Sequence, residues 1–314
     1  MEAVQSTQST QSKTETFAYS ADVSNVMSIL VKSIYTNKDI FLRELISNCS
    51  DAINKACLTN IKYQAGNEIR ISFNPELRQI TIQDSGCGIT KQDLINKIGS
   101  IGTSGTKQFM DAIAQSKDKL IGQFGVGFYS VYLVSSYIQI ITKPIDEDKT
   151  WEWTSGSEST YSIRELTSDD VENQDSTFVR GTKIILTLNS DADEYLEQDK
   201  LIEIIKTHSS YIEHPILFLK TEHVKSEEKN EEGRYEYHDE KKWEKLNWVP
   251  LWARPKDELT HQDYLDFYLH NIKDNLEQHV KEEPVIYKHF KVEGAVNFTA
   301  LLYIPAKAPF NLFE

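Results

Sequence analysis

Residues 41–55, FLRELISNCSDAINK, carry the most regular pattern in this chain. At about 100° per residue the pattern predicts a helix with two distinct sides. The apolar side is made of Leu42, Leu45, Ile46, Cys49, Ala52 and Ile53. The polar side carries a narrow stripe made of Glu44, Asn48 and Asp51. Helical spacing already begins near residue 26, so one or two helices open the first domain.

Strand patterns follow this helix. Residues 68–73 and 79–83 alternate between apolar and polar side chains, and residues 74–76 supply a turn, which predicts a β-hairpin. Further strand-like runs lie at 137–142, 151–153, 161–164 and 183–188. Helices around a series of hairpin-connected strands favour an α+β fold, a sandwich with one helical face.

Composition divides the chain, whose 314 residues suffice for about two domains. Residues 1–16 are rich in Gln, Ser and Thr and are expected to form a disordered tail. The first domain is predicted at 17–220. A short charged linker follows at 221–242, where aliphatic residues are almost absent. A second domain begins at 243 and stops at 314, with too few residues to complete a core.

Charge and cysteine content exclude several functions. The net charge of -14 repels nucleic acid and anionic lipid surfaces, so neither is an expected partner. No apolar run is long enough to span a membrane, and no secretory signal is apparent. The three cysteines, Cys49, Cys57 and Cys87, are too few for a disulfide framework. These features predict a cytoplasmic protein.

The polar stripe on the helix at 41–55 has two interpretations. It can be an ordinary solvent-exposed face. Alternatively, Glu44 is a general base that accepts a proton from an attacking water, and Asn48 offers a neutral oxygen to a magnesium ion. Asp51 would then hold water or ligand amides nearby.

The sequence DSGCG at 84–88 ends the second strand of the predicted hairpin. Such a segment can be a simple turn. It can also read a base, because the Asp84 carboxylate only accepts hydrogen bonds. It would therefore pair with the exocyclic amine of adenine and repel the carbonyl of guanine. The glycines would let the backbone approach the ring closely.

Two glycine-rich segments complete the set. GQFGVG at 122–127 precedes an apolar stretch at 128–134 that is expected to be a buried helix, so its N–H groups can bind phosphate. Its alternative is plain loop geometry, and it matches neither a P-loop nor a dinucleotide-binding turn. The loop at 99–107 is either a surface connection or a lid over a nucleotide. Together the segments supply the parts of an ATPase site.

Several segments of the sequence resemble a known family. The segments RELISNCSDA, DSGCGI, SGTK and GQFGVGFYS resemble, in this order, the nucleotide site of heat-shock protein 90 chaperones. They are more distantly similar to gyrase, histidine kinases and mismatch-repair ATPases. VPLWARPKDELTHQDYLDFY and FTALLYIPAKAPFNLFE resemble the start of the chaperone's middle domain. The resemblance covers nearly all of 17–314. It implies a two-layer α/β sandwich of the GHKL (Bergerat) ATPase type, followed by a partial α/β middle domain.

The resemblance also implies residue roles. Glu44 matches the catalytic general base, Asn48 the magnesium ligand and Asp84 the carboxylate that reads adenine. The residues implied to contact ATP or ADP are Asn48, Asp51, Asp84, Gly88, Ile89, Lys97, Ser104, Gly105, Gly122, Gly125, Val126, Gly127, Phe128 and Thr182.

Four features depart from the family pattern. Lys97 stands where an Asn is common, and Ile89 replaces a Met of similar volume. Gly102 and Thr103 replace an Ala and a basic residue in the lid, and the linker is shorter than in typical eukaryotic cytosolic members.

The implied function is an ATP-dependent chaperone that binds ATP or ADP with Mg²⁺ and couples slow hydrolysis to the clamping of client proteins, helped by co-chaperones. The complete chaperone would be a homodimer, and the dimerisation region is expected beyond residue 314. An Arg that stabilises the γ-phosphate is expected there too, so hydrolysis by this chain alone should be slow. The alternatives are a nucleotide-gated scaffold without hydrolysis and another ATPase of the same superfamily.

Overall fold

The computed structural model describes twelve parts of the chain, namely residues 14–19, 38–59, 66–99, 127–156, 160–167, 169–170, 178, 180–229, 235–247, 251–269, 283–294 and 298–306. The chain divides into two compact units, Met1–Asn247 and Trp248–Glu314. No helix in these parts of the chain is long and apolar enough to cross a membrane.

The first unit is built on one mixed sheet. Among the described residues it has nine strands in the order β1-β6-β5-β4-β7-β3-β2-β8-β9. Neighbouring strands are antiparallel, except that β2 and β8 are parallel. The strands are β1 (Glu15–Ala18), β2 (Ile69–Asn74), β3 (Gln79–Asp84), β4 (Ser135–Lys143), β5 (Thr150–Ser155), β6 (Thr160–Leu166), β7 (Gly181–Leu188), β8 (Ile216–Lys229) and β9 (Tyr235–Lys245).

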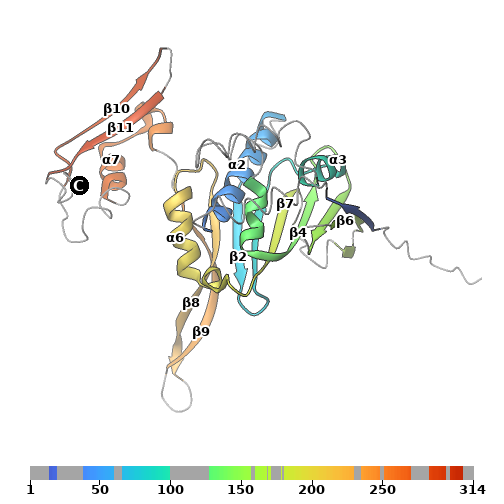
Figure 1. Ribbon diagram of the computed structural model, residues 1–314. Helices are drawn as coiled ribbons and strands as arrows, with labels where there is room; N and C mark the ends of the chain where they lie inside the picture. The colour runs from blue at the N-terminus through green and yellow to red at the C-terminus, as the bar shows by residue number, and fades with distance from the viewer. Residues whose placement is uncertain are drawn as a thin grey trace, which may run out of the picture. The chain divides into compact units, whose positions relative to one another are not determined.

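Helices cover one face of this sheet, as α2 and α6 show in Figure 1. In the described parts of the first unit the helical segments are α2 (Ile40–Thr59), α3 (Lys91–Asp93), the π-helical η3 (Leu94–Ile98), the 3₁₀ helices η5 (Gly127–Leu133) and η6 (Asp193–Leu196), and α6 (Gln198–Ser209). The apolar stretch predicted as a buried helix at 128–134 forms most of η5. The arrangement confirms the α+β sandwich with one helical face.

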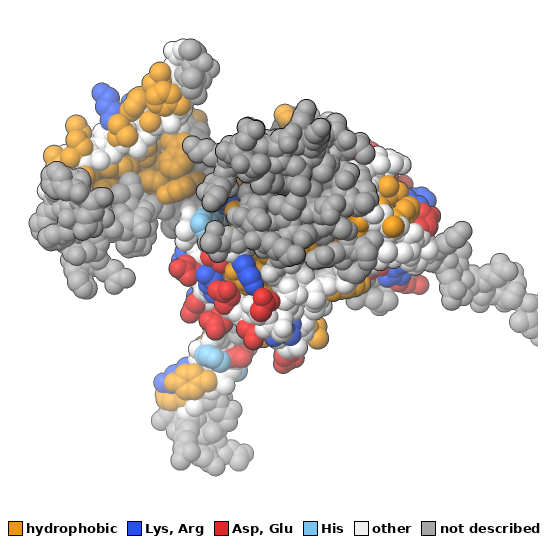
Figure 2. Space-filling view, in the orientation of Figure 1, with side chains coloured by type: hydrophobic (Ala, Val, Ile, Leu, Met, Phe, Trp, Pro, Cys, Tyr) orange, Lys and Arg blue, Asp and Glu red, His pale blue; other side chains and the backbone are white. Residues whose placement is uncertain are grey.

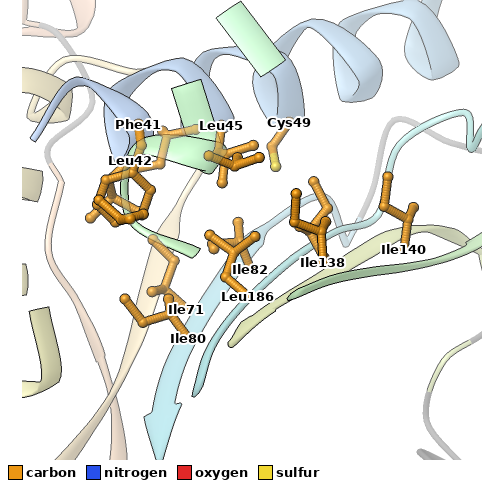
Figure 3. Close-up of a cluster of buried hydrophobic side chains, with 14 of the residues drawn as sticks. Phe41, Leu42, Leu45, Cys49, Ile71, Ile80, Ile82, Ile138, Ile140 and Leu186 are labelled. Atoms are coloured by element: carbon orange, nitrogen blue, oxygen red, sulfur yellow. The ribbon is translucent and has the colours of Figure 1, made fainter. Parts of the chain in front are cut away.

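The core of the first unit lies between α2 and the sheet. Side chains from β2, β3, β4 and β7 meet the apolar face of α2 (Figure 3). Leu42, Leu45, Ile46 and Ile53 are fully buried, as the helical periodicity predicts, whereas Ala52 is only half-buried. Burial of this face against a sheet fixes the rotation of α2, so the stripe that carries Glu44 must face away from the core.

The strand predictions agree with the structure. The predicted hairpin is β2 and β3, paired from Ile69 with Asp84 to Asn74 with Gln79. The other four predicted runs lie within β4, β5, β6 and β7. The early helical pattern from residue 26 lies largely outside the described residues, which resume at 38.

The segment predicted as a linker at 221–242 is mostly strand. Its residues form much of β8 and β9, a long antiparallel ribbon that extends away from the rest of the sheet (Figure 1). The ribbon is held by its backbone ladder and by cross-strand ion pairs such as Lys220 with Glu244 at 3.2 Å. Because such a ribbon buries few side chains, its composition resembles that of a linker. The division between the units falls after Asn247, later than the predicted boundaries at 220 and 243.

The second unit is smaller. It contains η7 (Leu251–Ala253), η8 (Lys256–Glu258), α7 (His261–Phe267) and the antiparallel pair β10 (Ile286–Val292) and β11 (Phe298–Ile304). A capping box between Thr260 and Asp263 starts α7. One face of the pair packs on α7 through an aromatic cluster that includes Tyr264 and Tyr287, whose ring centroids are 4.5 Å apart.

Candidate functional site

Helix α2 and the end of β3 hold the residues with the strongest predicted roles. Two features tie the turn after β3 to α2. The backbone N–H of Cys87 donates a hydrogen bond to the carbonyl of Ala52, at 3.1 Å. A Cβ atom at Gly86 would lie only 2.7 Å from the Ala52 Cβ, so glycine permits the close approach. The Asp84 turn and the middle of α2 are therefore one local structure.

Asp84 is a buried carboxylate, with 4% of the residue exposed. Its Oδ1 accepts hydrogen bonds from the backbone N–H of Gly86 at 2.7 Å and of Thr182 at 3.3 Å. Thr182 lies opposite Asp84 in the pairing of β3 with β7. Burial raises the pKa of Asp84 to about 7, against the lowering effect of these two donors. The group is thus a well-held acceptor whose charge changes near neutral pH.

A network of threonines surrounds the Asp84 turn. Thr142 Oγ1 donates to the carbonyl of Gly181 at 3.1 Å and accepts from the N–H of Ile89 at 2.8 Å. It also lies 3.2 Å from Thr182 Oγ1. Since a hydroxyl has one hydrogen, the Thr182 hydroxyl is the donor in that contact. The network holds Thr182 and Ile89 in fixed positions beside the turn.

Gly88 follows this turn with a backbone conformation that requires glycine. Its φ is +68°, in the left-handed region. A Cβ atom at this position would also overlap the backbone of Lys143. The structure thus groups Asp84, Gly88 and Thr182, together with the half-buried Ile89.

Glu44 lies where α2 meets the start of η5. A Cβ atom on Gly127 would overlap the Glu44 carboxylate, so the last glycine of GQFGVG contacts this side chain directly. Glu44 has 15% of its side chain exposed, and its Oε1 lies 2.8 Å from Nη2 of Arg43. Phe128 packs in the core against Trp153, with ring centroids 6.1 Å apart. The glycine segment and the predicted base are therefore neighbours.

Asn48 and Asp51 are both exposed on α2. They continue the polar stripe from Glu44, at helical spacing. Both side chains are accessible to a ligand or to water.

Lys97, in η3, is exposed and forms an ion pair with Asp93 at 3.0 Å. It also lies close enough to Cys87 to affect that thiol electrostatically. Burial raises the pKa of Cys87, while the charges of Lys55 and Lys97 lower it. Lys97 therefore lies near the Asp84 turn with its own charge already balanced by Asp93.

Several predicted residues lie outside the described parts of the chain. These are Ser104, Gly105, Gly122, Gly125 and Val126, together with the departures at Gly102 and Thr103. Most of the predicted lid and of the predicted phosphate segment therefore stay predictions.

Sequence reasoning missed two neighbours of Asp84. Cys49 was assigned only to the apolar face of α2, yet burial and the charge of Asp84 raise the pKa of its thiol. Thr142 was seen only as the end of a strand. Its position opposite Thr182 in the β4–β7 register is the feature that would have identified it.

A small cavity of about 190 Å³ lies at the same strand end, and its lining includes Asp84 and Ser85 of the turn. Arg70 and Gln83 also line it. These side chains leave the sheet on the face opposite to Ile82 and Asp84, because strand residues alternate between faces. The cavity is also below the usual size of a small-molecule site, roughly 300–1,000 Å³.

Known families match both units. A family model described as "Histidine kinase-, DNA gyrase B-, and HSP90-like ATPase" matches residues 35–185, and one described as "Hsp90 protein" matches residues 234–314. The two matched regions do not overlap. The first contains α2, the Asp84 turn and η5.

Relatives match almost the whole chain. Chaperone protein HtpG of Treponema denticola is 35% identical over 310 residues, which are 95% of this chain and 47% of the relative. HtpG of Hydrogenovibrio crunogenus is 37% identical, over 96% of this chain and 46% of the relative. An endoplasmin homolog of Arabidopsis thaliana is 38% identical, over 97% and 41%. The chain spans less than half the length of these relatives. It belongs to the heat-shock protein 90 family, with a GHKL-type ATPase domain in its first unit.

Proposed function

We propose that this chain is the nucleotide-binding part of an ATP-dependent chaperone, and that ATP and ADP bind across α2, the Asp84 turn and the start of η5. One observation carries the proposal. A buried carboxylate with fixed hydrogen bonds lies against the same helix that carries the largely shielded carboxylate of Glu44 and the exposed amide of Asn48. This combination suits an adenine bound at Asp84 and a metal-bound phosphate chain bound near Glu44 and Asn48.

Adenine recognition would depend on Asp84. Two backbone donors converge on Oδ1, so the other oxygen is available to accept the exocyclic amine. A hydrogen bond between an amine and a buried, ionised acceptor is stronger than one in water. Guanine and hypoxanthine present a carbonyl at this edge, which would face the carboxylate with no hydrogen between them. The geometry therefore favours adenine.

Magnesium would be held by Asn48 together with phosphate oxygens. Among the described residues there is no cluster of three or more His, Cys, Asp or Glu that could hold a metal by itself. Asn48 offers one accessible amide oxygen on the same stripe as Glu44. Mg²⁺ commonly keeps several waters and takes few protein ligands beside the phosphates of its substrate, so the donor set fits. When bound, the ion would neutralise phosphate charge.

Glu44 would act as the general base for hydrolysis. Its carboxylate is largely shielded and lies against Gly127, at the start of the helix whose N–H groups would face the phosphates. It can accept a proton from a water that attacks the γ-phosphate. The Arg43 ion pair orients the carboxylate but also occupies its Oε1 atom.

That ion pair favours a second candidate function, a nucleotide-gated scaffold that does not hydrolyse ATP. Phosphate release from a longer chain separates the two functions. If the longer chain binds nucleotide but releases phosphate no faster than a Glu44→Ala control, the result supports the scaffold function.

Partners follow from the family. Two groups of relatives are named chaperone protein HtpG and endoplasmin homolog, so client proteins and co-chaperones are proposed as partners of the complete protein, acting as a homodimer. A cytoplasmic location is also proposed.

A calorimetric titration tests the function. ADP should bind in the presence of Mg²⁺, and a purine-site inhibitor of the family should displace it. If neither ligand binds the folded chain, the proposal is wrong.

A further inference from the structure

We propose that the outer edge of β9, where the exposed side chains of Lys241, Trp243 and Lys245 share one face, binds an extended acidic segment of another protein by strand addition. The expected partner strand carries two carboxylates four residues apart, with an aromatic or large apolar residue midway between them. This surface is separate from the proposed nucleotide site and does not depend on it.

β9 is an end strand of the sheet. Among the residues that the structure describes, it pairs with β8 on one side, and no strand pairs with it on the other. Residues 237–243 are all exposed. The backbone N–H and C=O groups along such an edge can pair with a further strand. The edge of β9 therefore offers main-chain hydrogen bonds to an extended peptide.

Lys241, Trp243 and Lys245 lie on the same face of β9, because side chains along a strand alternate between faces. Trp243 is opposite Leu219 in the register of β8 and β9. Phe218, the residue before Leu219, is fully buried in the core of the first unit. The three side chains therefore point to the other side of the sheet, away from that core.

Trp243 is an exposed aromatic side chain that is held in place. It is 41% exposed, and the guanidinium carbon of Arg70 lies 5.6 Å from the centroid of its ring. Arg70 is fixed in turn by Glu68, whose Oε1 accepts a hydrogen bond from Nε at 2.6 Å. The indole is thus oriented by a cation while much of its surface is open to a ligand.

Lys241 and Lys245 supply charge that the protein does not neutralise. Within the parts of the chain that the structure describes, neither lysine forms an ion pair. On the opposite face, by contrast, Lys220 contacts Glu222 at 3.1 Å and Glu244 at 3.2 Å. Lysines on an edge strand discourage pairing with neutral or basic strands, so the same charges select an acidic one.

The charge of the whole chain does not prevent this binding. The net charge of -14 repels an acidic peptide at long range. At physiological salt, however, exposed charges are largely screened beyond about 8 Å, so the two lysines dominate close to the strand. Asp239, an acid on the same face of β9, is paired with His223. The local field at Lys241 and Lys245 therefore favours carboxylates.

The register gives the expected spacing in the partner. A strand added to β9 places its residues opposite those of β9, one for one. Carboxylates four residues apart would face both Lys241 and Lys245, and the residue midway would face Trp243. Carboxylates three residues apart would point to opposite faces, so only one could pair. Spacing thus distinguishes strand addition from general attraction between charges.

The test is fluorescence anisotropy of a labelled, β-prone peptide with two glutamates four positions apart and a phenylalanine midway between them. A control peptide of the same composition has its glutamates three positions apart. The first peptide should bind at least about threefold more tightly than the control, because it forms one more exposed ion pair and keeps the aromatic contact. Its affinity should fall as the salt concentration rises.

Variants of neighbouring lysines locate the binding face. Lys241→Ala and Lys245→Ala should each weaken binding by about twofold to fivefold. Lys242→Ala removes the same charge from an adjacent exposed residue on the opposite face, and its affinity should match the wild type. Trp243→Ala should have the largest effect, about tenfold or more, because it removes the aromatic contact. Circular dichroism verifies that each variant is folded.

Equal affinities for the two peptides, equal losses in Lys241→Ala and Lys242→Ala, or no binding of the first peptide at low salt would overturn the proposal. Binding of a single-stranded oligonucleotide in place of the peptide would also overturn it. ADP binding, measured on the same samples, should be unchanged in all four variants. Failure of the peptide site is therefore distinguishable from failure of the nucleotide site.

Discussion

The two ends of the proposed site differ in how their polar groups are held. At the base end, Asp84 and Thr182 are buried and bonded to fixed backbone or hydroxyl groups. At the phosphate end, Asn48 and Asp51 are exposed on α2, and Glu44 is only partly shielded. The base end is organised before a ligand arrives, whereas the phosphate end presents groups that a metal, water and phosphates can reach.

This contrast has a physical reason. Selective recognition of one base edge needs a desolvated acceptor, because water would satisfy any purine equally well. Metal binding and proton transfer need hydration and access. Changes at the base end should therefore remove binding, and changes at the phosphate end should mainly affect chemistry.

The largest effect is expected for Asp84→Asn. The amide keeps the side-chain size but can place an N–H where the adenine amine needs an acceptor, so ADP affinity should fall by at least about 10³-fold. Calorimetric titration measures this ADP affinity. Asp191→Asn, which alters an exposed ion pair with Lys38, is the control and should bind normally. Unchanged ADP affinity in Asp84→Asn would show that the base is read elsewhere.

The next effect is expected for Glu44→Ala. ADP affinity should stay within about threefold of the wild type, while phosphate release should fall by roughly 10²-fold or more, because the general base is lost. Glu76→Ala, an exposed change in the turn between β2 and β3, is a suitable control. Hydrolysis that continues at the wild-type rate would remove Glu44 from the catalytic role and favour another base.

Gly127→Ala tests the contact between the start of η5 and the Glu44 side chain on α2. Its Cβ would overlap the Glu44 carboxylate, so the free energy of unfolding should fall by about 1–3 kcal/mol. Chemical denaturation measures this change. Gly294→Ala places a Cβ in open space and should have little effect. Equal stabilities would mean that Glu44 can turn away without cost.

A further effect concerns stability and pH. Burial raises the pKa of Asp84 from 3.8 to about 7, so the folded state without ligand favours the protonated form. The stability that protonated Asp84 contributes to the folded state is fully present below about pH 4. It is lost as the pH rises through about 7. Denaturation of the wild type and of Asp84→Asn at both ends of this range measures it. The wild type should lose stability relative to the variant as the pH rises, and a constant difference would contradict the assignment.

Much of the fold could be predicted from the sequence. The apolar periodicity of α2 and the alternation in β2 and β3 are local patterns, and each element formed as they predict. The ribbon of β8 and β9 could not be predicted in this way, because paired backbone in a solvent-exposed hairpin needs no aliphatic side chains.

The second unit shows a related limit. Tyr264 and Tyr287 are 23 residues apart in the sequence, and only the structure shows that their rings stack. On the other side of the β10–β11 pair, Ile286, Leu302 and Ile304 are more than half exposed, and hydrophobic side chains are visible along it in Figure 2. A strand pattern alone does not say which face is covered.

For the site, residue chemistry proposed Glu44, Asn48 and Asp84 as candidates, but not what holds them. Thr142 and Cys49 act on the Asp84 turn through strand register and helix packing, which depend on residues far apart in the sequence. Their roles become visible only when α2, β4 and β7 are placed together.

The central claim is that Asp84 reads the amine of adenine. The most direct measurement compares calorimetric binding of ADP and inosine diphosphate in excess Mg²⁺ at a pH well above about 7, where Asp84 is ionised. The two nucleotides differ at the edge that would face Asp84, where an amine is replaced by a carbonyl. ADP should bind and inosine diphosphate should bind at least about 10²-fold more weakly. Equal affinities would contradict the account.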